Sequence, residues 1–300
     1  RGLGDVYKRQ EYMQGLITRF RKYGKFRTAE TYRATLRSFM AFRDNEDIVF
    51  DMFSDAIMQE YEAWHRRRGN CPNTVSFYMR ILRAVYNRAV VEDLTDNRNP
   101  FRNVDTGVDK TVKRALPLRC ISRLKRLDLQ CSPALEYSRD IFMLSFFLRG
   151  MSLIDMAFLR KSDLRNGSVT YRRRKTGQQL RVAWTPEMQA ILDKYPGNST
   201  RYLLPIIRKE GGNEYYAYRN AAYNINHNLK KIAKQLGIGI PLTMYVARHS
   251  WASAAKSKGI PLSVISEGMG HDNESTTQIY LASLDTAIID KANEKIIRSI

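Results

Sequence analysis

The sequence predicts a mainly helical chain with one small β-hairpin, an α+β fold divided into two domains. Three observations predict it. Apolar residues recur at three- and four-residue spacing along most of the chain, strand-like alternation occurs in one stretch only, and one basic segment lacks periodicity. With 300 residues the chain can hold two domains, because single domains usually contain roughly 100–200 residues.

The segment from Tyr12 to Val91 carries the helical pattern four times and shows no strand signal. Thr28, Ser54 and Asn73 are suited to cap three of these helices, and the segment after Asn73 carries the longest apolar stripe. We therefore expect a four-helix domain at the start of the chain.

The domain boundaries follow from composition. The first ten residues, RGLGDVYKRQ, lack an initiator methionine and resemble a translated adaptor sequence, so we expect residues 1–10 to be a non-native leader. The segment 97–117 contains Pro100, Gly107 and Pro117 among several charges, which is typical of a linker. We expect the helical domain over residues 11–101, the linker over 102–117 and a second domain over 118–300.

The second domain mixes helices with a hairpin. Alternating Val169/Tyr171 and Leu180/Val182 predict two strands, and Gly177 supplies a turn residue that tolerates positive φ. Helices are expected over residues 133–148, 152–158, 186–194, 218–236, 245–258, 262–269, 276–282 and 286–297.

The charge balance indicates a polyanionic partner. The chain has 50 Lys and Arg against 30 Asp and Glu, a net charge of +20 and a pI near 9.9, whereas small domains usually carry a net charge of roughly 2–8. A merely solvated basic surface is the alternative. The candidate nucleic-acid contacts of the helical domain are arginines on its outward positions: Arg33, Arg37, Arg80 and Arg83.

The other composition signals exclude some classes of protein. Three cysteines without CxxC spacing indicate neither a disulfide framework nor a zinc site. The longest apolar run, residues 141–148, is far shorter than the roughly 20 residues of a membrane span. We expect a cytoplasmic protein without a membrane partner.

Three residues near the end of the chain carry the strongest chemical signal. His271 follows Arg248 by 23 positions (271 − 248) and Tyr280 follows His271 by 9 (280 − 271). A phenol can attack a phosphate covalently, a guanidinium stabilises the charge that builds in phosphoryl transfer, and an imidazole moves protons near neutral pH. The spacing predicts a phosphodiester-transfer site without metal or cofactor. Each residue also has an ordinary interpretation. Tyr280 could be a core tyrosine, Arg248 could form a surface ion pair, and His271 could be the neighbour of a helix cap.

These residues stand in the segments Tyr245-Val246-Ala247-Arg248-His249, Met269-Gly270-His271 and Tyr280. In this form the chain resembles the tyrosine recombinases, or phage-type integrases, whose pattern is His-x-x-Arg-His, Leu-Gly-His and a tyrosine nine residues later. The resemblance extends from about residue 12 to the end of the chain. It implies a helical core-binding domain, a linker and a catalytic domain that cuts and rejoins DNA strands through a 3′-phosphotyrosine. We expect a packing or hydrogen-bonding role for His249.

The resemblance also implies a lysine on the hairpin that protonates the leaving 5′ oxygen. Lys175 is the matching residue, and Arg173 and Arg174 are the alternatives for this position. We expect Arg172, Arg173 and Arg174 to contact DNA. Asp155 stands where the family often has an acidic residue that buttresses the site; it could hold Arg248 or His249, or be a plain surface carboxylate.

The chain departs from the family pattern at two positions. Tyr245 stands where the family usually has histidine; a phenol, with an ordinary pKa of about 10, is no base at pH 7 but can donate a hydrogen bond to phosphate. Ser152 stands where an upstream arginine is expected. On a continuous helix Arg149 would share a face with Ser152, so we expect Arg149 to deliver the missing charge, with Arg160 or Lys161 next.

The resemblance implies double-stranded DNA as the partner, four protomers on two DNA sites and accessory DNA-bending proteins. The helix over residues 286–297 would dock on a neighbouring protomer or pack on its own domain. Integration, excision and inversion of a DNA segment fit equally well. The alternatives are a catalytically impaired DNA-binding accessory or regulatory protein, and a topoisomerase with the same chemistry.

Overall fold

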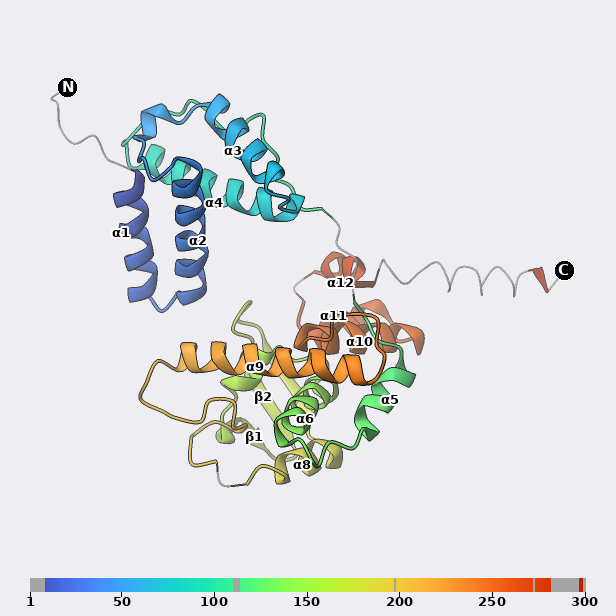
Figure 1. The fold of residues 1–300 in the computed structure, drawn as a ribbon. Helices are drawn as coiled ribbons and strands as arrows, with labels where there is room; N and C mark the ends of the chain where they lie inside the picture. The colour runs from blue at the N-terminus through green and yellow to red at the C-terminus, as the bar shows by residue number, and fades with distance from the viewer. Residues whose placement is uncertain (1–8, 110–113, 197, 272, 282–296, 299–300) are drawn as a thin grey trace. The chain divides into compact units, whose positions relative to one another are not determined.

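The computed structural model describes residues 9–109, 114–196, 198–271, 273–281 and 297–298, and divides into two compact units, Arg1–Thr111 and Val112–Ile300 (Figure 1). The division falls inside the predicted linker. Helices dominate both units and one small sheet lies in the second, so the predicted fold class is confirmed. The helix expected over residues 286–297 lies almost entirely outside the described residues.

The first unit contains the four predicted helices: α1 (Arg9–Lys22), α2 (Phe26–Phe42), α3 (Asp55–Arg67) and α4 (Pro72–Val91), with a short 3-10 helix, η1 (Phe50–Met52). Ser54 caps α3 as predicted, accepting a hydrogen bond from the Ile57 amide. The predictions for Thr28 and Asn73 are wrong. Helix α2 begins two residues before Thr28, and α4 begins at Pro72, whose fixed φ and missing N–H suit the first helical turn.

Aromatic rings fill the core between these helices. Phe39 packs edge-on against Tyr61, with ring centroids 4.9 Å apart, and is stacked with Phe53 at 5.7 Å. Such pairs stabilise a fold beyond the area they bury. This unit therefore has a hydrophobic core of its own.

His65 lies inside that core as a neutral ring. Its Nδ1 lies 2.8 Å from the side-chain amide nitrogen of Asn70, which can only donate a hydrogen bond. Its Nε2 lies 3.1 Å from the hydroxyl of Ser38. Tyr78 stacks on the ring at 4.9 Å. Burial, assisted by the charge of Arg68, lowers the pKa of His65 to about 4.

The start of the predicted linker is fixed on α4. Asn73 exchanges two hydrogen bonds with the backbone of Asp109, at 3.1 and 2.9 Å, and the Ser76 hydroxyl donates to the Gly107 carbonyl at 2.7 Å. Arg80 donates to that same carbonyl at 2.5 Å, and Arg83 to the Thr106 hydroxyl at 2.9 Å. These two arginines, expected to contact nucleic acid, thus hold residues 106–107 against their own helix.

The second unit surrounds a buried helix, α6 (Pro133–Phe147), whose residues from Ser138 to Ser145 are all buried. Helices α9 and α10 make its most extensive contacts. The other helices are α5 (Leu118–Arg126), which the sequence did not predict, α7 (Leu153–Ala157), α8 (Pro186–Asp193), α9 (Glu214–Gln235), α10 (Met244–Ser257), α11 (Leu262–Met269) and α12 (Glu274–Leu281), with the 3-10 helix η2 (Lys161–Asp163).

The sheet has three antiparallel strands in the order β1-β2-β3: β1 (Leu164–Arg165), β2 (Ser168–Arg172) and β3 (Gln179–Ala183). The hairpin of β2 and β3 was predicted, whereas β1 was not. Asn166 and Gly167, both at positive φ, connect β1 to β2 in the manner of a tight hairpin turn.

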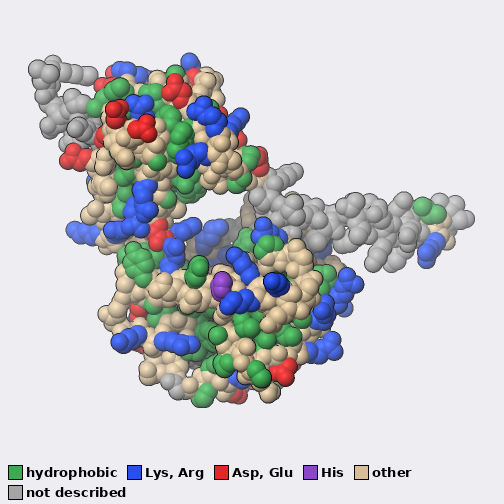
Figure 2. Space-filling model, viewed as in Figure 1, with side chains coloured by type: hydrophobic (Ala, Val, Ile, Leu, Met, Phe, Trp, Pro, Cys, Tyr) green, Lys and Arg blue, Asp and Glu red, His purple; other side chains and the backbone are tan. Residues whose placement is uncertain are grey.

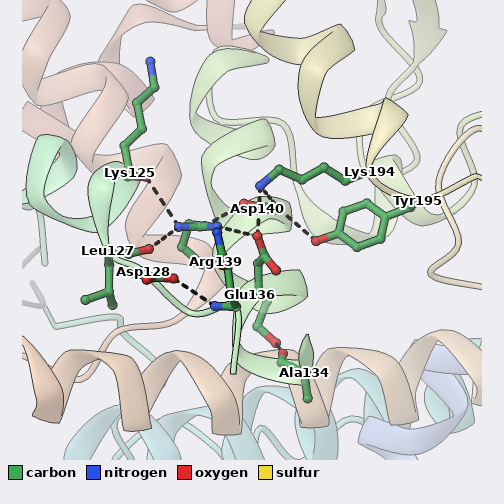
Figure 3. A network of polar contacts seen from close by, with 11 residues as sticks. Lys125, Leu127, Asp128, Ala134, Glu136, Arg139, Asp140, Lys194 and Tyr195 are labelled. Atoms are coloured by element: carbon green, nitrogen blue, oxygen red, sulfur yellow. Dashed lines mark hydrogen bonds and ion pairs between the residues drawn. The ribbon is translucent and has the colours of Figure 1, made fainter. Parts of the chain in front are cut away.

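A buried ionic network joins α5, α6 and α8 (Figure 3). Arg139, which is 6% exposed, donates to Asp140 at 2.6 Å and to the Leu127 carbonyl at 2.6 Å. The second oxygen of Asp140 accepts from Lys194 at 3.0 Å and from the Tyr195 hydroxyl at 2.8 Å. Because each buried charge has a partner, removal of one member would leave another uncompensated.

Lys and Arg side chains are spread over the visible face of the second unit, with few Asp or Glu between them (Figure 2). None of the described helices is long and apolar enough to cross a membrane.

We predict that acid destabilises the first unit through His65. The pKa of His65 in the folded protein lies below its ordinary value of 6.5, so the unfolded chain takes up the proton first as the pH falls. The stability that the neutral His65 ring contributes is therefore complete above pH 6.5 and is lost as the pH falls towards about 4. The loss is on the order of a few kcal/mol, since one pKa unit corresponds to about 1.4 kcal/mol. Urea unfolding followed by Trp64 fluorescence, with Trp184 and Trp251 changed to Phe, measures it. An equal pH dependence in His65→Gln would contradict the assignment.

Candidate active site

Arg248 and His271, predicted from spacing, lie in direct contact. Arg248, on α10, is 6% exposed, and its Nη2 lies 3.0 Å from His271 Nε2. The same nitrogen donates to the Met269 carbonyl at 2.6 Å, and Nη1 donates to the Gly150 carbonyl at 3.0 Å. The guanidinium is therefore held in one orientation by fixed acceptors before any ligand reaches it.

Gly150 allows this approach because it has no Cβ. A Cβ built there would lie 2.6 Å from Arg248 Cα and 2.9 Å from its Cβ and Cγ. Gly150 also has a φ of +73°, in the left-handed region that favours glycine. Gly150 was not among the residues predicted from the sequence.

The helical argument for Arg149 is wrong. Helix α6 ends at Phe147, Arg149 itself has a φ of +59°, and Ser152 is the N-cap of α7, accepting from the Asp155 amide. Arg149 and Ser152 therefore lie on either side of a turn and share no helix face. Arg149 is half-buried beside α11, where its Cδ would lie 3.7 Å from a Cβ added at Gly268.

The hairpin brings a further guanidinium to the turn after α11. Arg173, 7% exposed, donates from Nη1 to the carbonyl of Gly270. Arg173, predicted as a DNA contact beside Lys175, is buried next to Gly270 and so belongs to the same cluster as Arg248. Two arginines from distant segments thus bind the consecutive carbonyls of Met269 and Gly270.

The rest of the hairpin tip is tied to α7. Asp155, 4% exposed, accepts from the Ser152 hydroxyl at 2.6 Å and from the Arg174 amide at 2.9 Å. Its buttressing contacts therefore go to Ser152 and the hairpin rather than to Arg248 or His249. The Arg174 guanidinium covers the ring of Phe158 at 4.0 Å, and Lys175 is exposed at the tip. Arg172, also exposed, donates to the Gly177 carbonyl at 2.7 Å.

The cluster is electropositive. Burial lowers the pKa of His271 to about 4, and the charges of Arg248, Arg173 and Lys175 add to that effect. Burial also raises the pKa of Tyr171, on β2, to about 12, with Asp155 adding to the shift and Arg173, Arg248 and Arg149 opposing it. The same cations therefore act on one small region, and such a region attracts an anion.

Tyr245 lies on the exposed side of α10. Its side chain is 54% exposed, and its ring meets that of His249 edge-on with centroids 4.4 Å apart. His249 is 3% exposed, as a packing role requires. Tyr245 is therefore accessible to a ligand while one side of its ring is supported.

Tyr280 belongs to α12, but its side chain lies outside the described part of the chain. The helix is fixed through Leu281, which packs with Ala252, Ala255, Ile265 and Met269 of α10 and α11. Three residues before Tyr280, the buried Thr277 has its hydroxyl 2.8 Å from His271 Nδ1. Thr277 was not predicted as a site residue, although it stands one helical turn before Tyr280 in the sequence.

The remaining predicted DNA contacts lie in the first unit. Arg37 is exposed on α2, and Arg33, on the same helix, is half-buried. Arg80 and Arg83 bind residues 106–107 as described above.

Comparison with known proteins gives consistent matches along the chain. Residues 10–106 match the phage integrase SAM-like domain, and residues 127–287 match the phage integrase family. The tyrosine recombinase XerD of Listeria innocua serovar 6a is 24% identical over 272 residues, which cover 84% of this chain and 86% of that protein. The tyrosine recombinase XerA of Thermococcus kodakarensis is 25% identical over 237 residues, covering 77% of each chain.

Solved structures share the fold. A lambda integrase dimer bound to a COC′ core site aligns with a TM-score of 0.67 at 14% identity, covering 93% of this chain and 97% of that one. The Tn1549 transposon integrase in complex with transposon right end DNA aligns with a TM-score of 0.65 at 16% identity, covering 97% and 99%.

We predict that Gly150→Ala displaces Arg248 and destabilises the second unit. Gly167→Ala is the matched control, because Gly167 has a φ of +65° but no heavy atom within 4 Å of an added Cβ. The left-handed backbone alone costs about 1–2 kcal/mol in either variant, and the clash in Gly150→Ala adds roughly 1–3 kcal/mol. Urea unfolding of the two variants measures the difference. Equal losses would show that α10 does not need the close approach at Gly150.

Proposed function

The chain belongs to the phage integrase family, and on that premise we propose that it is a site-specific DNA recombinase, a tyrosine recombinase that cuts and rejoins strands through a 3′-phosphotyrosine. One observation carries the proposal: a fixed guanidinium, Arg248, contacts His271 in a buried cationic cluster next to the helix that contains Tyr280. In this proposal residues 118–300 are catalytic and residues 11–101 bind the DNA core site.

The cluster suits a phosphodiester in the transition state of phosphoryl transfer. Charge then builds on the non-bridging oxygens, and donors fixed in advance stabilise it without reorganising during the reaction. Arg248 meets this requirement because the carbonyls of Gly150 and Met269 hold its fork. Tyr245, exposed on the same helix, is suited to donate a further hydrogen bond to a phosphate oxygen.

The reaction consists of two transesterifications. The phenol of Tyr280 gives up its proton with the assistance of His271, and its oxygen bonds to phosphorus. The bond from phosphorus to the 5′ oxygen breaks, and Lys175 supplies the proton that the 5′ oxygen needs. The 5′ hydroxyl of the partner strand then attacks the phosphotyrosine, Lys175 recovers its proton and the phenol leaves. The phosphotyrosine keeps the energy of the broken bond, so no nucleotide cofactor and no metal are required by this sequence of steps.

Two arginines compete for the role of the second phosphate-binding guanidinium. Arg149 is half-buried beside α11, and Arg173 is almost fully buried on the Gly270 carbonyl. Arg173 and Arg248 bind adjacent carbonyls of one turn, so Arg173 is the better placed of the two. We therefore propose Arg173 as the second phosphate-binding guanidinium and Arg149 as a further one in the same pocket.

The partners follow from the same proposal. We infer double-stranded DNA as the substrate in the cytoplasm, with Arg33, Arg37, Arg172 and Arg174 near its backbone and four protomers on two sites. Accessory DNA-bending proteins would assist the assembly. A catalytically impaired accessory protein is disfavoured, because the chain retains Arg248, Lys175, His271 and Tyr280. The separate helical domain disfavours a topoisomerase.

We predict that the protein forms a covalent adduct with DNA. A nicked suicide duplex containing the target site, obtainable from repeats that flank the gene, should trap the phosphotyrosine because the released fragment diffuses away. The adduct should migrate as a larger species in denaturing gels and be absent in Tyr280→Phe, while binding to the duplex is retained. Binding without an adduct would indicate the accessory protein instead.

We predict that Arg173→Ala lowers the rate of adduct formation by roughly 10²–10³-fold, as expected for loss of one donor to the transition state. Arg149→Ala tests the other guanidinium under the same conditions. Arg165→Ala, an exposed position of β1, is the matched control and should react normally. A single-turnover assay at saturating protein separates cleavage from binding. Normal cleavage by Arg173→Ala together with loss in Arg149→Ala would return the role to Arg149 alone.

A further inference from the structure

Thr277 contacts the imidazole of His271 from the helix that contains Tyr280. Its side chain is 0% exposed, and its hydroxyl oxygen lies 2.8 Å from His271 Nδ1. Thr276, its neighbour on the same helix, is exposed. The contact therefore joins α12 to the turn that carries His271, and only one of the two threonines makes it.

Two contacts of His271 with described residues indicate which of its nitrogens carries the proton. Arg248 Nη2 lies 3.0 Å from Nε2, and a guanidinium donates but never accepts, so Nε2 accepts. A neutral imidazole that accepts at one nitrogen carries its proton on the other. His271 Nδ1–H therefore donates to the Thr277 hydroxyl oxygen.

We propose that Thr277 is a positioning residue that holds His271 as the Nδ1–H tautomer, so that Nε2 takes the proton of the attacking Tyr280 phenol. This inference rests on the proposed function and deepens it. In the first transesterification the phenol proton passes to His271 Nε2 as the oxygen bonds to phosphorus. In the second, the imidazolium returns that proton to the leaving phenol oxygen, so the side chain ends as it began.

Arg248 makes the exchange possible. When phosphate oxygens take over the Nη2 donor of Arg248, the Nε2 lone pair becomes available to accept a proton. The negative charge of the phosphate also offsets the cations around His271 and raises the pKa of its ring from about 4 back towards neutrality. Binding of the substrate would thus convert a resting hydrogen-bond acceptor into a base.

The other histidines are less suited to this role. The chain has four, and Tyr245 replaces the one that the family pattern would place on α10. His65 belongs to the core of the first unit, His227 is exposed on α9, and His249 is buried behind the ring of Tyr245. His271 is the histidine in contact with Arg248, which leaves the proton transfer to it.

The tautomer can be measured without DNA. In full-length protein labelled with nitrogen-15 histidine, four ring systems are observed, and His271→Gln identifies the signals of His271. Wild type and Thr277→Ser should show the Nδ1–H form, whereas Thr277→Val, similar in shape but without the hydroxyl, should show a substantial Nε2–H population. Thr276→Val should leave the spectrum unchanged. An Nδ1–H form that persists in Thr277→Val overturns the proposal.

Activity gives the second readout. On the suicide duplex Thr277→Val should form the adduct roughly ten- to hundredfold more slowly, because a buried donor without a partner is costly, while Thr277→Ser and Thr276→Val react nearly as wild type. If Thr277→Val does not fold, Thr277→Ala lacks the same hydroxyl and replaces it. A shifted tautomer with unchanged cleavage overturns the role in proton transfer. If the wild-type protein forms no adduct, the proposed recombinase function is overturned instead. The tautomer measurement needs no DNA, so it tests the role of Thr277 independently of that outcome.

Discussion

The position of Arg248 is the constraint on which the site depends. Its guanidinium can meet the carbonyls of Gly150 and Met269 only because Gly150 lets the backbone of α10 approach to a distance that any Cβ would prevent. A left-handed turn after α6 provides that glycine. The direction of the Arg248 guanidinium is therefore set by the packing of α10 against this turn.

A second chain of contacts starts from the same guanidinium. Arg248 contacts His271, His271 contacts Thr277, and Thr277 belongs to the helix of Tyr280. Helix α12 is also held by Leu281, which packs against α10 and α11. Because polar and apolar contacts converge on the turn between α11 and α12, displacement of Arg248 would disturb both the His271 imidazole and the helix that contains Tyr280.

The spacing of apolar residues predicted nearly all of the helices, because amphipathic periodicity depends only on which face is buried. Local turn chemistry was predicted less well. The Asn166–Gly167 turn that creates β1 was overlooked, and the break after α6 depends on Arg149 and Gly150 adopting positive φ, which an alignment to a continuous helix cannot reveal. Arg248 and His271 were found because their spacing is specific, whereas Thr277 emerges only when the direction of each side chain is known.

Ser152 explains how the pocket can form without an arginine at that position. Its hydroxyl caps α7 and donates to Asp155, which in turn accepts from the Arg174 amide and so anchors the hairpin tip. An arginine or lysine at position 152 could not cap α7, because its cationic group accepts no hydrogen bond, and the lost cap would cost about 0.5–2 kcal/mol. On the anchored hairpin Arg173, the residue that follows β2, reaches the Gly270 carbonyl. The hydrogen bonds of Asp155 thus join the cap of α7 to the hairpin that carries Arg173.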